Sequence, residues 1–268
     1  MDNRPIGVFD SGLGGLTVVK ELMKELPGES ITYFGDTGRV PYGTRSKGII
    51  TKYATQDINF LISRNVKAIV VACGTVSSVA LSFLREKFSL PIIGVVDATA
   101  KAAAAVTVNK KVGILGTSGT IASGAYERKL KELDEKIETV PRECPLFVPL
   151  VENGHINCIE TYHIACNYLQ PLKDKEVDTI ILGCTHYPLL KEVIADIMGS
   201  DTKLVDSAAP TCGHVSRLLD EKDMRSGSGH AEYRYFVSDS ADSFSKLGSV
   251  FLQKEITGSV SQIEIEQY

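Results

Sequence analysis

Residues 6–28 read IGVFDSGLGGLTVVKELMKELPG, and this stretch holds the pattern that decides the fold. Residues 6–10 are apolar and strand-like, and a glycine-rich turn follows at 11–15. Apolar residues then recur at helical spacing over 16–26, and the Pro-Gly pair at 27–28 ends that helix. A buried strand, a tight turn and an amphipathic helix form one strand–helix unit of a parallel sheet.

The same alternation of apolar strands and amphipathic helices continues along the chain. Helical segments of roughly 10–20 residues separate most of the strands. Continuous apolar strands linked by helices imply a parallel sheet covered on both faces, which is the doubly wound α/β class. The further strands are predicted at residues 31–35, 68–73, 92–97, 112–116, 179–184 and 204–206.

Part of this pattern occurs twice. AIVVAC at 68–73, followed by GTVSS, resembles TIILGC at 179–184, followed by THYPLL. In both cases a buried strand ends in Cys, and a Thr stands within two residues of it. The GVFDSGLGG segment at 7–15 has a similar echo in GILGTSGT at 113–120. Such self-similarity indicates two similar α/β lobes.

We place the first lobe at residues 1–97 and 207–268, and the second at 98–206. Ligands of open parallel sheets bind beyond the carboxyl ends of the strands. Cys73 and Cys184 stand at such ends, one in each lobe. Two facing lobes would therefore bring the two thiols to opposite sides of one cleft.

Composition excludes several classes of protein. The 268 residues include 29 Lys and Arg against 33 Asp and Glu, a formal net charge of −4. A nucleic-acid-binding protein would usually be basic, so that class is disfavoured. No apolar stretch approaches the roughly 18 residues of a membrane span. The N-terminus lacks a basic region followed by a long apolar one. We expect a cytoplasmic protein with no membrane partner and six reduced cysteines.

The last part of the chain is predicted to close the first lobe. Residues 222–231, KDMRSGSGHA, are polar and glycine-rich, which is typical of a surface loop. A strand at 233–238 and a helix at 241–254 follow. A hairpin-like cover on the first lobe accounts for this segment.

Cys184, Thr185 and His186 are the first candidates for chemistry. A free cysteine is mostly thiol at neutral pH and therefore a poor base. An imidazole two residues away would stabilise the thiolate, as would backbone N–H groups at a helix start, where Pro188 suits the first turn. The alternative is a core cysteine near a surface histidine. Polar residues at the carboxyl end of a strand favour a functional site.

Cys73, Gly74 and Thr75 form the matching element in the first lobe. Taken alone, Cys followed by Gly at a strand-to-helix turn has a structural explanation as readily as a functional one. Paired with Cys184, it supports a shared function, because stereochemical inversion requires an acid/base group on each face of a carbon. One thiolate removes the proton, and the opposing thiol returns one.

Two turns are expected at the same cleft. Asp10 and Ser11, with the glycines after them, would supply a carboxylate and anion-binding amides. A dinucleotide fingerprint starting at Gly12 would need glycine where Thr17 stands, so NAD or FAD is not expected. The turn GDTGRVPYG at 35–43 follows the next strand, and a plain type I or II turn explains it equally well.

One cluster has the spacing of a metal site and is not expected to bind metal. His155, Cys158, His163 and Cys166 read H-x2-C-x4-H-x2-C. If this stretch is helical, it spans about 16 Å, and the four side chains cannot converge on one tetrahedral ion.

Taken together, these segments resemble the glutamate racemases of bacterial cell-wall synthesis almost end to end. In chain order the matching segments are IGVFDSGLGGLTV, GDTxRVPYG, VVAC-x-T, GTxGTI, FVPLVE at 147–152 and LGCTHYPLL, the last being the most specific. In that family two similar α/β lobes enclose the active site and no cofactor is used. The resemblance implies interconversion of L- and D-glutamate by two-cysteine acid/base proton transfer at the α-carbon, which supplies D-glutamate for peptidoglycan.

The resemblance also assigns roles to individual residues. It implies that Cys73 and Cys184 are the acid/base thiols and that Asp10, Glu152 and His186 assist them. Family members often form dimers, so we expect a homodimer. Some carry an N-terminal extension tied to activation by a wall precursor, and no such activation is expected here. The implied substrate-binding residues are Asp10, Ser11, Pro41, Tyr42, Gly43, Gly74, Thr75, Thr117, Thr120, Thr185 and His186.

Gly74 is a departure, because the family usually has Asn after the first cysteine. Losing an amide that binds substrate costs about 0.5–1.5 kcal/mol, or about 1.5–3 kcal/mol where it meets a charged group. Binding would weaken from a few-fold to about a hundred-fold. A racemase of aspartate, or a cysteine-dependent isomerase or decarboxylase of another small dicarboxylate, is therefore an alternative. A non-catalytic amino-acid-binding protein is a third interpretation, disfavoured by the two cysteines.

Overall fold

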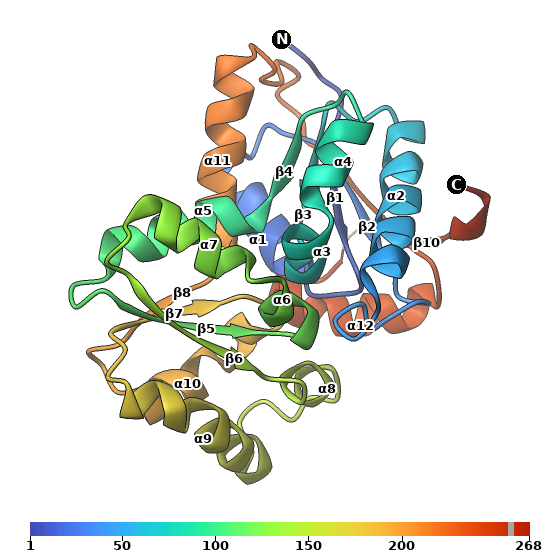
Figure 1. The fold of residues 1–268 in the computed structure, drawn as a ribbon. Helices are drawn as coiled ribbons and strands as arrows, with labels where there is room; N and C mark the ends of the chain where they lie inside the picture. The colour runs from blue at the N-terminus through green and yellow to red at the C-terminus, as the bar shows by residue number, and fades with distance from the viewer. Residues whose placement is uncertain (257–259) are drawn as a thin grey trace.

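The computed structural model describes residues 1–256 and 260–268, and the strands of this part form two parallel sheets, one in each lobe (Figure 1). The α/β class with two doubly wound lobes is thereby confirmed. The first sheet has the strand order β10-β9-β2-β1-β3-β4. Its strands are β1 (Ile6–Asp10), β2 (Ile31–Gly35), β3 (Ala68–Val71), β4 (Ile92–Gly94), β9 (Tyr233–Val237) and β10 (Val260–Gln262).

Helices cover both faces of this first sheet because side chains alternate along each strand. Phe9 and Phe34 pack on one face, in the same cluster as residues of α2 and α4. Val8 and Tyr33 pack on the other, with residues of α1, α11 and α12. The helices of this lobe are α1 (Leu16–Glu25), α2 (Lys47–Ser63), α3 (Gly74–Val79), α4 (Leu81–Lys87), α11 (Ala208–Glu221), α12 (Ala241–Leu252) and the 3-10 turn η2 (Ile265–Gln267).

The second sheet has the strand order β6-β5-β7-β8. Its strands are β5 (Lys111–Gly116), β6 (Glu138–Glu143), β7 (Thr179–Leu182) and β8 (Lys203–Val205). Its helices are α5 (Val95–Val106), α6 (Ser118–Ser123), α7 (Ala125–Leu133), α8 (Phe147–Glu152), α9 (Ile159–Asp174), the 3-10 turn η1 (Tyr187–Leu190) and α10 (Lys191–Met198).

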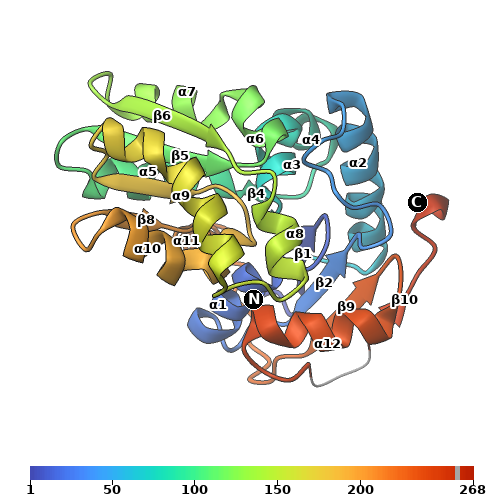
Figure 2. The same cartoon turned by 90° about the horizontal axis from the view of Figure 1, so that it is seen from below.

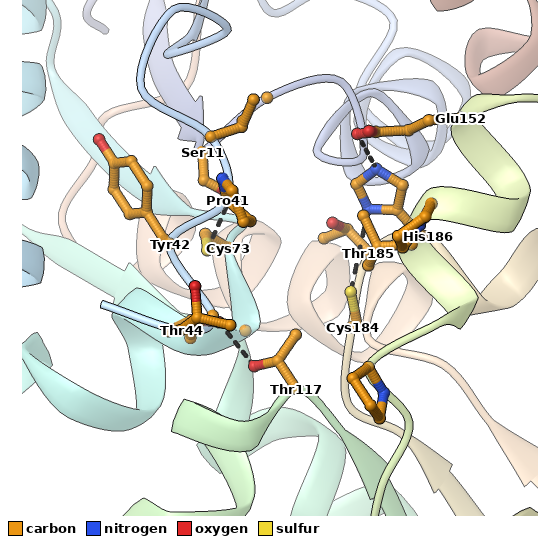
Figure 3. Close-up of a pocket in the computed structure, with 18 of the residues that line it drawn as sticks. Ser11, Pro41, Tyr42, Thr44, Cys73, Thr117, Glu152, Cys184, Thr185 and His186 are labelled. Carbon is orange, nitrogen blue, oxygen red and sulfur yellow. Dashed lines mark hydrogen bonds and ion pairs between the residues drawn. The ribbon is translucent and has the colours of Figure 1, made fainter. Parts of the chain in front are cut away.

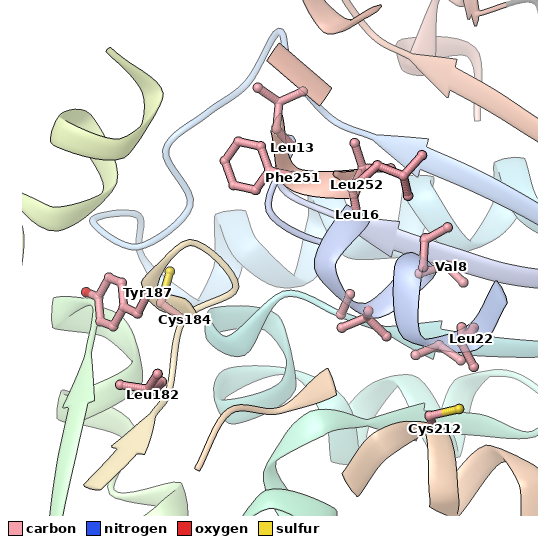
Figure 4. Packing of buried hydrophobic residues seen from close by; sticks show 14 of the residues in the cluster. Val8, Leu13, Leu16, Leu22, Leu182, Cys184, Tyr187, Cys212, Phe251 and Leu252 are labelled. Atoms are coloured by element: carbon pink, nitrogen blue, oxygen red, sulfur yellow. The ribbon is translucent and has the colours of Figure 1, made fainter. Parts of the chain in front are cut away.

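Two chain crossings and one apolar cluster join the lobes. The chain passes to the second lobe through α5 and returns through α11, and these two helices pack against each other (Figures 1 and 2). Leu16 of α1 and Leu182 of β7 belong to one continuous cluster of buried side chains (Figure 4). Burying a side chain of this size contributes about 1.5–3 kcal/mol, so the apolar cluster stabilises both lobes together.

The structure corrects three details. Residues 95–97 begin helix α5 instead of continuing strand β4, and the Ser77 hydroxyl accepts a hydrogen bond from the Val95 N–H at 3.1 Å. Strand β6, missed in the sequence, is a polar edge strand that pairs only with β5 among the described strands. The C-terminal strands are not a hairpin: β9 and β10 extend the first sheet in parallel.

Residues 222–231 follow helix α11 and form neither helix nor strand, as predicted for a loop. The division into residues 1–97 with 207–268 and residues 98–206 stays a prediction, and its first boundary would fall inside α5. Among the described residues, no helix combines the length and the apolar character that crossing a membrane requires.

Candidate active site

A cavity of about 260 Å³ lies between the lobes (Figure 3), and residues that follow the carboxyl ends of β1, β3 and β7 line it. Its walls come from both lobes, so neither sheet encloses it alone. The predicted site residues that line it are Ser11, Pro41, Tyr42, Gly43, Cys73, Gly74, Thr75, Thr117, Glu152, Cys184, Thr185 and His186. Two predicted residues, Asp10 and Thr120, do not line it.

Cys73 stands two residues beyond β3, at the residue that precedes α3. Its Sγ lies 3.5 Å from the Ser11 hydroxyl, to which the thiol donates. Burial, together with the nearby Asp10 carboxylate, raises the pKa of Cys73 to about 12. Cys73 is therefore held as a thiol, which can donate a proton into the cavity.

Cys184 lies on the opposite wall, in a different electrostatic setting (Figure 3). The Nδ1 atom of His186 is 3.9 Å from the Cys184 Sγ, and its Nε2 atom is 2.9 Å from the Glu152 carboxylate. Burial alone would lower the pKa of His186, but the hydrogen bonds to Cys184 and Glu152 outweigh it and raise this pKa to about 10. The imidazole is then a cation at neutral pH, and it lies directly beside the Cys184 sulfur.

Asp10 does not line the cavity, but it contacts residues that do. Its carboxylate is buried and accepts hydrogen bonds from the Gly12 N–H at 3.0 Å and from the Thr185 hydroxyl at 3.3 Å. Burial raises the pKa of Asp10, while the charge on His186 opposes that rise. This carboxylate orients Thr185, which itself lines the cavity.

A chain of threonine hydroxyls connects the lobes on another side of the cavity. The Thr75 and Thr117 hydroxyls are 2.9 Å apart, and those of Thr117 and Thr120 are 3.1 Å apart. Thr120 is buried behind Thr117. Its hydroxyl therefore acts on the cavity only through Thr117.

The Tyr42 side chain points away from the cavity, and its ring is buried (Figure 3). Its hydroxyl donates to the carboxylates of Asp36 and Asp57. Arg39 bridges the same two carboxylates at 2.7 and 3.0 Å. Burial raises the pKa of Asp57, and the adjacent Asp36 raises it further. This network anchors the turn that follows β2, and residues 40–44 of that turn line the cavity.

We predict that Tyr42→Phe lowers the free energy of unfolding by about 1.5–3 kcal/mol, because it removes hydrogen bonds to buried carboxylates. The KM for substrate should change little, since the hydroxyl faces the network and not the cavity. Chemical denaturation and steady-state kinetics measure the two quantities. Tyr53→Phe, which keeps the ring packed beside Tyr42, is the matched control. A raised KM with unchanged stability would contradict this assignment.

Sequence reasoning missed one wall of the cavity. Cys144, Val148 and Pro149 line it beside Glu152, and they come from the segment that runs from β6 into α8. The FVPLVE motif at 147–152 overlaps that segment, but the sequence analysis predicts only its Glu152 as a site residue. Burial raises the pKa of Cys144, so it is a neutral thiol in an apolar wall.

The His and Cys residues at 155–166 do not all lie on one helix, although the sequence analysis assumed a helical stretch. Helix α9 begins only at Ile159, so His155 and Cys158 precede it, and the Cys158 Sγ lies 3.9 Å from the His155 Nδ1. In the part of the chain that the structure describes, no three His, Cys, Asp or Glu side chains gather as metal ligands would.

Comparison with known proteins supplies independent information. Residues 19–214 match the family model for Asp/Glu/hydantoin racemases. A glutamate racemase from Geobacter metallireducens is 46% identical over 264 residues, which cover 98% of this chain and 97% of that protein. Among solved structures, a Bacillus anthracis glutamate racemase isoform superposes with a TM-score of 0.94 at 38% identity, with 98% of each chain covered. A Francisella tularensis glutamate racemase in complex with D-glutamate also gives 0.94, at 40% identity and full coverage of both chains.

Proposed function

The chain belongs to the Asp/Glu/hydantoin racemase family and interconverts L- and D-glutamate, and we propose that Cys73 and Cys184 transfer the protons. It is thus an isomerase acting on an amino acid, and the D-glutamate formed supplies peptidoglycan synthesis for the cell wall. The observation that carries the proposed residue roles is that two thiols, one from each lobe, face one small cavity (Figure 3).

Glutamate bound between the lobes would present one face of its α-carbon to each thiol. The Cys184 thiolate, stabilised by the His186 imidazolium, takes the α-proton, so that a C–H bond breaks and an S–H bond forms. Cys73, held as a thiol by burial, donates its proton to the opposite face. The configuration inverts, and the reverse reaction exchanges the two roles.

The α-proton of glutamate is weakly acidic, so negative charge on the carbanion must be stabilised. We assign this task to the hydroxyls of Ser11, Thr75 and Thr185, which line the cavity, with Asp10 orienting Thr185. Glu152 holds the His186 ring and its charge through the 2.9 Å hydrogen bond.

We further propose that the enzyme works as a homodimer in the cytoplasm. The dimer rests on the family resemblance, and sedimentation velocity at micromolar concentration should give twice the mass of the chain. A reaction that needs two free thiols suits a compartment where thiols stay reduced. Recovery of the activity with the soluble cell extract, and its absence from the periplasmic fraction, would support this location.

The decisive experiment incubates the purified protein with L-glutamate in D2O and follows optical rotation together with loss of the α-proton. Loss of rotation with deuterium in the product is the expected result. It would also show that the reaction tolerates Gly74. If the protein inverts aspartate in the same assay but does not invert glutamate, the alternative substrate is favoured. Binding of glutamate without any exchange would point to a binding protein.

A further inference from the structure

Gly74 brings the two lobes into direct backbone contact. It is the first residue of α3, and it faces Gly183, which follows β7 in the other lobe. A Cβ at position 74 would lie 2.2 Å from the carbonyl oxygen of Gly183 and 3.8 Å from the Cα of Cys184. Real Cβ contacts do not fall below 3.0 Å, so only glycine fits this spacing.

The carbonyl of Gly183 cannot simply move aside. The Gly183 N–H donates to the Leu115 carbonyl at 2.8 Å, and a Cβ on Gly183 would itself meet that carbonyl at 2.7 Å. Gly183 is thus packed against β5, and the residue that follows it is Cys184. A Cβ at position 74 would therefore displace either Cys184 or the second lobe as a whole.

A second group of contacts, independent of Gly74, holds the lobes at the same spacing. The Gly119 N–H donates to the Gly43 carbonyl at 2.8 Å across the cleft. A Cβ on Gly43 would lie 2.7 Å from the Cβ of Thr117, and Thr117 bonds to the Thr75 hydroxyl. Close approach at these points leaves little freedom to absorb a larger residue at position 74.

We propose that Gly74 is a positioning residue that sets the distance between the lobes, and with it the distance between the two thiols and the length of amino acid the cleft accepts. This inference rests on the proposed function, in which Cys73 and Cys184 must reach one α-carbon from opposite sides. It reverses the expectation for the Asn that the family usually has at this position. Asn at position 74 would not restore a hydrogen bond to substrate in this chain, because its Cβ would act as a wedge between the lobes.

The test compares Gly74→Ala and Gly74→Asn with Gly48→Ala. Gly48 also lies in the first turn of a helix, and a Cβ there meets nothing within 4 Å. Since a misplacement of about 1 Å can cost about a hundred-fold in rate, kcat/KM for glutamate should fall by that order in both Gly74 variants. The ratio of turnover with 2-aminoadipate, one methylene longer, to turnover with glutamate should rise. The Gly48→Ala variant should match the wild type.

Gly119→Ala provides a graded second variant, because its Cβ would lie 3.1 Å from the Gly43 carbonyl. It should lower kcat/KM for glutamate and raise the ratio of 2-aminoadipate to glutamate turnover, both by less than the Gly74 variants do. If the Gly74 variants fail to fold, this variant tests the inference in their place. Wild-type kinetics within about twofold in Gly74→Ala, or higher activity in Gly74→Asn, would overturn the inference. So would an unchanged Gly119→Ala enzyme where the Gly74 variants do not fold. A wild type that does not racemise glutamate would instead contradict the proposed function.

Discussion

Cys184→Ser is expected to lose inversion of glutamate in both directions, by roughly 10²–10⁴-fold, the usual contribution of a positioned general acid or base. A serine hydroxyl is a much weaker acid than a thiol, so it gains little from the His186 charge 3.9 Å from the native Sγ. Cys73, which is the base in the reverse reaction, remains intact in this variant and still faces one side of the α-carbon. The variant should therefore exchange the α-proton of one enantiomer for deuterium without inverting it.

The measurement supplies each enantiomer separately in D2O and follows the α-proton by NMR and the configuration by chiral chromatography. Cys73→Ser should show the opposite preference between the enantiomers. Cys166→Ser, which changes an exposed thiol on α9, should keep the wild-type rates. Exchange of both enantiomers at equal rates in either single variant would show that one base serves both faces.

His186→Asn is expected to reduce kcat by roughly 10- to 150-fold, which corresponds to losing a hydrogen bond of about 1.5–3 kcal/mol to a charged partner. The imidazolium is the cation next to Cys184, and its pKa of about 10 keeps it charged at neutral pH. Wild-type activity should therefore decline as the pH rises through about 10, and the variant should lack that decline.

A variant of the partner of His186 and a control variant test the role of the charge on its imidazole. Glu152→Gln keeps the imidazole but weakens the partner 2.9 Å from its Nε2, so the alkaline decline should move to lower pH. His163→Asn, at an exposed position of α9, should leave the pH profile unchanged. An alkaline limb that persists unchanged in His186→Asn would assign it to another group.

The raised pKa of His186 also predicts how the stability of the folded protein depends on pH. Its pKa is raised from 6.5 to about 10 on folding, so its protonated form is favoured in the native state. That contribution is fully present below about pH 6.5 and is lost as the pH rises toward 10. Between these values the wild type should lose more unfolding free energy than His186→Asn, as measured by denaturation at each pH. Equal losses in the two proteins would contradict the raised pKa.

The order of apolar strands and amphipathic helices predicted the α/β class because burial on both faces of a sheet leaves a local signature. It succeeded for β1 and β2, whose residues are all buried. It failed for β6, because an edge strand with one exposed side carries polar residues such as Glu138 and Arg142. It also extended β4 into α5, because Val95 and Val96 are apolar whether they continue a strand or begin a buried helix.

The sequence by itself determined which residue types stand at the carboxyl ends of the strands, and therefore that Cys73 and Cys184 would each lie at the ligand-binding edge of its own sheet. Parallel strands bring those ends to one edge of each sheet whatever lies between them. Only the tertiary structure decided which way the Tyr42 hydroxyl points and how closely Gly74 approaches Gly183. Such contacts join segments far apart in the chain, and their distances follow from the packing of whole lobes, which no local pattern of residues encodes.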